Sequence, residues 1–205
     1  MQDTTVLLAF AASFFFIAAS PGLCMTLSMS LGIRLGLRRT LWMMAGELIG
    51  VGLVAAAAAL GVSSLLLGAP KAFALFKLAG AAYLFWSGWQ CWRSPTPDLQ
   101  APVQADGTTR SRLALQGFLT AASNPKAWAF NAALLPPFID AARPLAPQLS
   151  ALLVILLSIE FLCLVGYAQG GRTLAAWLHR GGHGRWLNRI SGGLMVGVGI
   201  WLLLS

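Results

Sequence analysis

Long apolar stretches dominate this chain and leave little of it for anything else. Hydrophobic residues occupy 58% of the 205 positions and charged residues 10%, whereas a soluble domain carries about 25% charged residues. A helix crosses the hydrocarbon core of a bilayer with about 20 apolar residues. Six stretches reach that length: 5–28, 41–66, 72–92, 113–139, 148–170 and 186–204. The sequence therefore predicts an all-α integral membrane protein with six transmembrane helices and no soluble domain.

The basic residues are unevenly distributed among the connections between these spans. Most of the 14 lie in or beside the first, third and fifth connections: Arg34, Arg38, Arg39, Arg93, Arg110, Arg112, Arg172, Arg180, Arg185 and Arg189. Cytoplasmic loops are enriched in Lys and Arg, so these connections are predicted to be cytoplasmic and both termini periplasmic. The net charge of +8 then reflects membrane orientation rather than nucleic-acid binding. The first residues contain Asp3 and no basic residue, unlike a secretory signal, so we expect the first span to be retained.

The chain divides into two similar halves around a polar, proline-rich linker at 94–110. The third span reads KLAGAAYLFWSGW and the sixth reads RISGGLMVGVGIW, with a basic residue, a glycine and a tryptophan at corresponding places. Residues 1–93 and 111–205 are therefore predicted to be two repeats within one transporter domain. Three spans per repeat place the second copy upside down, and inverted repeats are typical of secondary transporters. The alternative is six generic helices, because apolar sequences align easily.

Each repeat has a proline within its first span, Pro21 and Pro125. A proline inside a helix leaves a backbone carbonyl without its usual donor, and in hydrocarbon such groups must face protein or water. Backbone groups and half-helix ends at such breaks can bind a small polar ligand. The candidate substrate-binding residues are Pro21, Gly22, Asn124, Pro125 and Lys126. Two alternatives stay open: each break is an ordinary proline kink, and Lys126 extends to the membrane surface or pairs with a carboxylate.

One acid lies in the second span of each repeat, Glu47 and Glu160. Ionisable residues within membrane spans are costly and mostly functional. Burial disfavours the charged form of a carboxyl group, which suits the binding and release of a proton. Glu47 and Glu160 are therefore the candidate proton-coupling residues. The alternative is a structural role, in which each acid hydrogen bonds to a neighbouring helix.

Pairs of glycines four residues apart allow membrane helices to approach closely. Gly46 and Gly50 form such a pair in the second span, and Gly193 and Gly197 form another in the sixth. Both pairs are predicted to be helix-packing positions without a ligand role.

The chain offers few side chains for metal binding or catalysis. Cys24, Cys91 and Cys163 lack the spacing of metal ligands and are predicted to be buried thiols. His179 and His183 fall in a predicted loop among basic residues. No metal or cofactor is therefore predicted, and an intramembrane enzyme is disfavoured. A structural subunit would need neither matched breaks nor buried acids.

Four stretches carry a family resemblance over nearly the whole chain. They are SPG in the first span, KLAGAAYLFWSGW in the third, GFLTAASNPKAWAF in the fourth and WLNRISGGLMVGVGI in the sixth. Together they resemble the LysE/RhtB family of amino-acid exporters. The resemblance implies a six-helix carrier, in many members a homodimer, in a bacterial inner membrane. It also implies export of amino acids or related small zwitterionic metabolites, driven by the proton-motive force.

The resemblance is incomplete in the first repeat. The family usually has Pro-Gly-Pro-Asn in the first span, and here Leu23 and Cys24 follow Pro21 and Gly22. Glu47 stands where the family often has Asp. The NPK triplet of the fourth span matches fully. Since a polar side chain is missing from the first break, another cargo, such as a metal ion or a small drug-like compound, stays an alternative.

The predicted topology can be tested by labelling the two chain ends. Single cysteines introduced at Gln2 and Ser205 in a variant without the native cysteines should react with an impermeant thiol reagent added to the periplasmic side. Protection of either position from that reagent, with labelling only after the membrane is permeabilised, would contradict the six-span topology.

Overall fold

A computed structural model of the chain describes most of its residues. The described segments are 4–19, 22–68, 70–93, 109–140, 142–179 and 183–204. These segments are helical apart from short turns and contain no strand. The prediction of an all-α protein is therefore confirmed for the described part of the chain.

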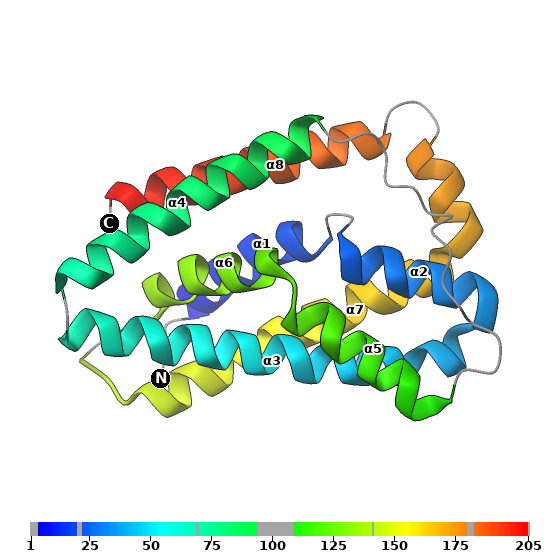
Figure 1. Cartoon of the computed structure of the whole chain (residues 1–205), viewed down its shortest axis with the longest axis horizontal. Helices are drawn as coiled ribbons and strands as arrows, with labels where there is room; N and C mark the ends of the chain where they lie inside the picture. Colours follow the sequence, from blue (N-terminus) through cyan, green and yellow to red (C-terminus); the bar gives the residue numbers. More distant parts are fainter. Residues whose placement is uncertain are drawn as a thin grey trace.

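The helices follow the same order in the two halves of the chain (Figure 1). The first half contains α1 (Thr4–Ala18), α2 (Leu23–Leu35), α3 (Leu37–Gly68) and α4 (Pro70–Arg93). The second half contains α5 (Arg110–Ala122), α6 (Pro125–Leu134), the 3-10 turn η1 (Pro136–Phe138), α7 (Leu145–His179) and α8 (His183–Leu204). In each half, two short helices separated by a break precede a long helix and a last helix. This order is the one that two three-helix repeats would produce, and their inversion stays a prediction.

Two helices are long and apolar enough to cross a membrane by themselves, over Leu37–Gly61 of α3 and Leu145–Gly171 of α7. The pair α1 and α2 meets the same criterion when taken together and is bent by 62° at its break. The described residues thus support two or three membrane-crossing segments by length and composition. The prediction of six stays a prediction.

Each long helix packs against the broken pair of the other half. Helix α3 lies along α5 and α6, helix α7 lies along α2 and α1, and α4 lies along α8 (Figure 1). The contact between α2 and α7 includes a hydrogen bond of 2.8 Å from the Ser28 hydroxyl to the Leu164 carbonyl. The two halves are therefore interlocked rather than placed side by side.

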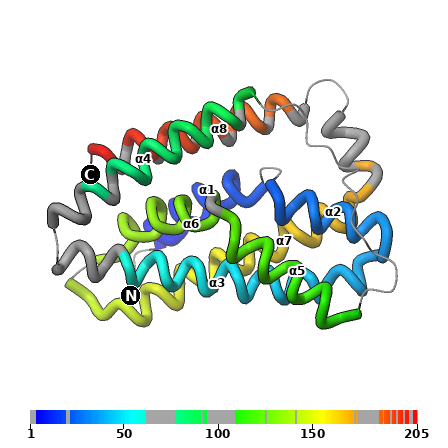
Figure 2. Tube along the Cα trace, viewed as in Figure 1, coloured from blue at the N-terminus to red at the C-terminus, as the bar shows by residue number. Residues whose placement is uncertain are grey.

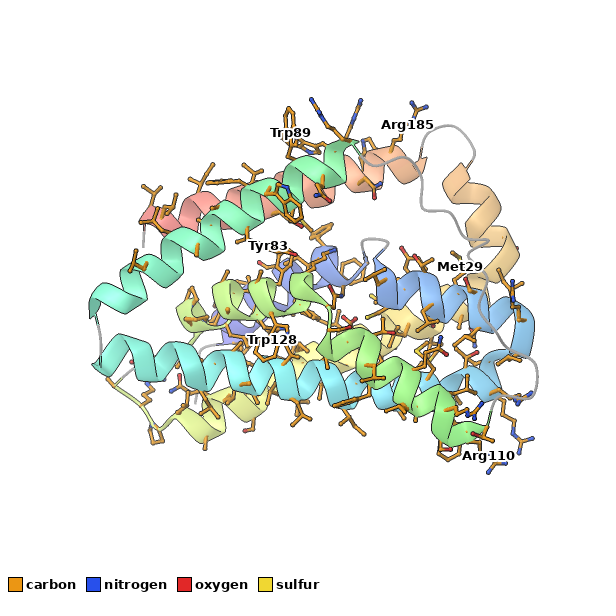
Figure 3. All side chains as sticks on the ribbon, viewed as in Figure 1. Met29, Tyr83, Trp89, Arg110, Trp128 and Arg185 are labelled. Atoms are coloured by element: carbon orange, nitrogen blue, oxygen red, sulfur yellow. The ribbon has the colours of Figure 1, made fainter. Side chains whose placement is uncertain are left out.

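The chain runs back and forth along the long axis of the molecule (Figure 2). The start of α1 and the end of α8 lie at one end, on the left of the view. The junction of α2 with α3 and the starts of α5 and α8 lie toward the other end, where Figure 3 shows Arg110 and Arg185. Arg110 and Arg185 thus lie away from the chain ends, and the orientation of the chain in the membrane stays a prediction.

The crossing of α3 and α5 is tight because glycines lie on both helices. A Cβ atom on Gly46 would collide with the Ala114 carbonyl oxygen, and one on Gly117 would collide with the Met43 carbonyl oxygen. A Cβ atom on Gly50 would lie 2.9 Å from a backbone oxygen of α5. Close helix packing at Gly46 and Gly50 is therefore confirmed.

The predicted packing role of Gly193 and Gly197 is wrong. No described atom lies within 4 Å of a Cβ built on either residue. The contact of α8 with α4 uses Gly192 instead, where a Cβ would lie 2.6 Å from the Gly88 carbonyl oxygen. Glycine spacing identified the helix but not the face that meets its neighbour.

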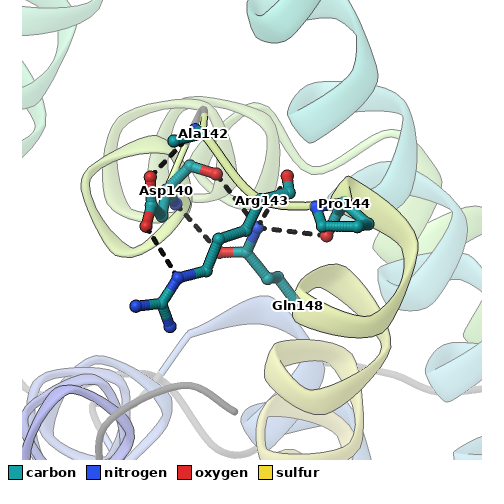
Figure 4. Close-up of polar contacts among 5 residues, drawn as sticks. All are labelled: Asp140, Ala142, Arg143, Pro144 and Gln148. Carbon is teal, nitrogen blue, oxygen red and sulfur yellow. Dashed lines mark hydrogen bonds and ion pairs between the residues drawn. The ribbon is translucent and has the colours of Figure 1, made fainter.

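Gln148, near the start of α7, organises the connection from η1 to that helix (Figure 4). Its side-chain amide donates to the carbonyl oxygens of Asp140, Arg143 and Pro144 at 3.0, 3.2 and 3.1 Å, and its oxygen accepts from the Asp140 amide at 2.9 Å. Arg143 also forms an ion pair with Asp140 at 3.0 Å. These bonds satisfy the backbone of the connection and hold it against the first turns of α7.

Replacing the buried glycine of the α3–α5 crossing should destabilise the protein. Gly117→Ala would force a backbone shift, and overpacking of this kind costs about 1–3 kcal/mol. Gly193→Ala is the matched control because its Cβ meets no described atom, and alanine favours a helix by about 0.5–1 kcal/mol over glycine. Melting in detergent should therefore show a lower transition for Gly117→Ala only. Equal melting temperatures for both variants would contradict the tight crossing.

Candidate functional site

The break in the first half lies between Ala18 and Leu23. The carbonyl of Ala19, at the end of α1, accepts a hydrogen bond of 2.8 Å from the Tyr167 hydroxyl on α7. Gly22 has extended backbone angles and precedes α2, and its carbonyl accepts from the Thr26 amide at 2.9 Å. Pro21 lies outside the described residues. The described part of this break is thus supported by the other half of the chain.

The break in the second half separates α5 from α6. Pro125 is the first residue of α6, a position at which proline is favourable because its missing N–H would have no partner in the helix. Asn124 caps the helix: its side-chain oxygen accepts from the Lys126 amide at 3.0 Å, and its carbonyl accepts from the Ala127 amide at 3.0 Å. The NPK triplet therefore encodes a capped helix start.

The prediction that the Pro125 break frees backbone carbonyls for a ligand is wrong for the two that end α5. The Ala121 carbonyl, four residues before Pro125, accepts from the Asn124 amide at 3.2 Å. The Ala122 carbonyl accepts from the Trp128 indole N–H at 2.9 Å. A carbonyl in an apolar surrounding is costly without a donor, and nearby groups have supplied one in each case. The break contributes side chains to the site rather than bare carbonyls.

Both breaks border one cavity of about 70 Å³, with room for several water molecules. It is lined by residues of α1, α2, α3, α6 and α7. Its polar lining consists of Cys24, Glu47, Asn124, Lys126, Asn131 and Glu160, with Gly22 beside them. Its apolar lining consists of Phe14, Ile17, Ala18, Leu23, Met25, Val51, Ala127 and Phe130. The cavity therefore combines both signs of charge with an apolar wall.

The structure brings together five of the residues predicted from sequence to form the site. Gly22, Glu47, Asn124, Lys126 and Glu160 all line the cavity. Pro125 begins the helix that carries Lys126, although its side chain lies outside the described part, as does all of Pro21.

The two acids come from the two long helices and face the same space. Glu47 on α3 is fully buried, and Glu160 on α7 is 8% exposed. Each lies within electrostatic range of the other, and Lys126 lies within range of Glu160. Among the described residues, none makes a hydrogen bond to either carboxyl oxygen of Glu47. The cavity thus contains a buried carboxyl group without a hydrogen-bond partner among the described residues.

Two polar lining residues, Asn131 and Cys24, were not predicted as site residues. Asn131 on α6 is 4% exposed, and its side-chain amide donates to the Ala127 carbonyl at 2.8 Å. It follows Asn124 by two helical turns, a spacing that could have indicated a shared face. Cys24 is buried as predicted, but it lies in the cavity wall beside Glu47. The place of Cys24 just after the first break could have indicated that it lines the cavity.

Comparison with known proteins identifies the group to which this arrangement belongs. The family model of the LysE type translocator matches residues 15–205. The chain is 32% identical over 187 residues to the homoserine/homoserine lactone efflux protein of Salmonella typhimurium. The matched region covers 91% of this chain and 90% of the relative. It is 30% identical over 201 residues to an uncharacterized membrane protein of Vibrio cholerae, with 98% of both chains covered. No solved structure matches the chain.

The helix cap at Asn124 can be separated from any other role of that residue. Asn124→Ala removes the acceptor for the Lys126 amide and should cost about 0.5–2 kcal/mol of stability. Serine is a good capping residue, so Asn124→Ser should melt within about a few tenths of a kcal/mol of the parent protein. Melting in detergent would measure both variants. Equal destabilisation by alanine and serine would show that the cap is not what stabilises this break.

Proposed function

The chain belongs to the LysE type translocator family, and from this premise we propose that it exports small amino-acid-like zwitterions across the bacterial inner membrane in exchange for protons. Membrane transport follows from the family and from the apolar helices. The cargo, the coupling to protons and the inner-membrane location are the proposal. The observation that carries it is the cavity, in which two carboxyl groups and one lysine lie against an apolar wall.

The lining of the cavity suits the two charges of a zwitterion. A primary ammonium group would bind on the side of the cavity that holds the acids, because a buried cation needs a carboxylate partner. A carboxylate would bind near Lys126 and the side-chain amide of Asn124. Lys126 reaches toward the ring of Phe130, with 5.9 Å between its Nζ atom and the ring centroid. Lys126 and Phe130 both line the cavity, which supports a role for the lysine there.

The apolar wall and the size of the cavity favour a short cargo. Phe14, Val51 and Phe130 offer aromatic and aliphatic surface to a side chain of a few carbons. Homoserine is the first candidate, because two relatives are named for homoserine and its lactone. Both molecules carry an ammonium group, and only homoserine carries a carboxylate. The replacement of a polar residue by Cys24 makes this wall less polar than the family pattern implies.

The fold supports alternating access through the two breaks. The cavity is bordered by Gly22 of the first break and Asn124 of the second. Pro21 and Pro125 are their neighbours in sequence. Two inverted repeats that rock against each other around this point would expose it to either side in turn. We include in the proposal six spans, periplasmic termini and assembly as a homodimer.

Transport in proteoliposomes tests this function. A gradient of about one pH unit stores about 1.4 kcal/mol per proton, which supports about tenfold accumulation in a one-to-one exchange. Vesicles with an acidic interior and a clamped membrane potential should therefore take up labelled homoserine against its gradient, and a protonophore should abolish this uptake. Asn124→Ser, which keeps the helix cap, should lower uptake by about tenfold because it removes the amide that meets the cargo.

Protein-free vesicles provide the background, and competition by unlabelled amino acids, their lactones and drug-like amines ranks other cargo. Uptake that is indifferent to the pH gradient would refute proton coupling. A failure of every amino acid to compete, with transport of an amine, would refute the zwitterionic cargo.

A further inference from the structure

The two acids of the cavity have different surroundings. Glu160 lies near a positive charge, that of Lys126. Glu47 is fully buried, and no described residue hydrogen bonds to either of its carboxyl oxygens. Two acids at corresponding places in the two repeats therefore differ in whether the protein itself compensates their charge.

Glu47 shares the cavity with three other titratable groups, each on a different helix. They are Cys24 on α2, Lys126 on α6 and Glu160 on α7. Helix α5 packs against the backbone at Glu47 through Gly117, but contributes no residue to the lining among those described. The lysine next to Glu160 is thus the sole cation among the described lining residues.

A buried carboxylate without a partner is strongly destabilising, so a bare charge on Glu47 is unfavourable in this cavity. Two events remove that cost. A proton from water neutralises the carboxyl group, or a cation from the cargo pairs with the carboxylate. Glu160 differs because Lys126 lies close enough to offset part of its charge.

We propose that Glu47 is the single group at which a proton and the ammonium group of the cargo compete, while Glu160 and Lys126 stay paired as a fixed charge pair. This inference rests on the proposed function. When the ammonium enters, the O–H bond of the Glu47 carboxyl breaks, the carboxylate pairs with the ammonium, and the proton leaves to water. One cargo molecule therefore displaces one proton.

The same cost explains why the carrier would not move cargo or protons without exchanging one for the other. The empty cavity with a charged Glu47 is unfavourable in every conformation that excludes water. The protein then changes between its two access states only when a proton or a cargo molecule is bound at Glu47. It does not change when Glu47 is charged and empty. A one-to-one exchange follows from one unpartnered carboxyl group.

Isothermal titration calorimetry with homoserine tests the inference directly. Titrations of the purified protein in two buffers with different ionisation enthalpies give the number of protons released per molecule bound. The parent protein should release about one proton, and Glu47→Gln should bind at least about tenfold more weakly and release fewer than about 0.1, since it has no proton to exchange. Glu47→Asp, which keeps a carboxyl group, should restore release.

The matched control neutralises the other acid together with its partner. Removing Glu160 alone would leave Lys126 to pair with Glu47, so Glu160→Gln is combined with Lys126→Gln. This double variant binds homoserine more weakly but should still release about one proton per molecule bound at saturation. Size-exclusion elution and melting in detergent verify that each variant is folded.

Loss of proton release in the double variant, with release retained in Glu47→Gln, would transfer the role to Glu160 and overturn the inference. Binding by the parent protein without proton release, alongside gradient-driven uptake in vesicles, would overturn the inference and leave the proposed function standing. Absence of binding and uptake for every amino acid would refute the proposed function, and the inference with it.

Discussion

Helix breaks inside an apolar surrounding expose amide and carbonyl groups that cannot reach bulk water. The two breaks of this protein solve that problem with side chains. Asn124 caps the start of α6, the Trp128 indole donates to the last carbonyl of α5, and the Tyr167 hydroxyl donates to the Ala19 carbonyl at the end of α1. Because the backbone is satisfied in this way, both breaks can lie beside a cavity whose chemistry is set by side chains. These hydrogen bonds fix the helix ends that bring Gly22, Asn124 and Lys126 to the acids of the two long helices.

Much of this arrangement could be predicted from sequence, because it follows from features that are local in the chain. Apolar runs of bilayer length identified the long helices, the prolines identified where helices are interrupted, and single acids in apolar runs identified Glu47 and Glu160. Grouping them in one site depended on the correspondence between the two halves. That correspondence places residues far apart in sequence at equivalent positions, and the cavity does contain five of the seven predicted residues.

What could not be predicted depends on which faces of helices meet. The donor to the Ala19 carbonyl comes from Tyr167, 148 residues away, and no local pattern links the two. Gly192 and Gly193 are neighbours in sequence, but only the first faces α4. The carbonyls at the Pro125 break were expected to be free because proline removes a donor, whereas the Asn124 amide donates to the Ala121 carbonyl and the Trp128 indole of α6 donates to the Ala122 carbonyl of α5. Such partners depend on tertiary packing that single-residue reasoning does not contain.

The interlocked pairing of the halves has a consequence for biogenesis. Helix α3 is made long before α5, so during synthesis the surface around Gly46 and the carboxyl group of Glu47 lack the cover that α5, α6 and α7 later provide. The nascent first half would hold a polar side chain against lipid or the insertion machinery until the second half arrives. Stable integration of this protein is therefore expected to be a late event, completed when the second long helix enters, and a truncated chain would be a natural substrate for membrane proteases.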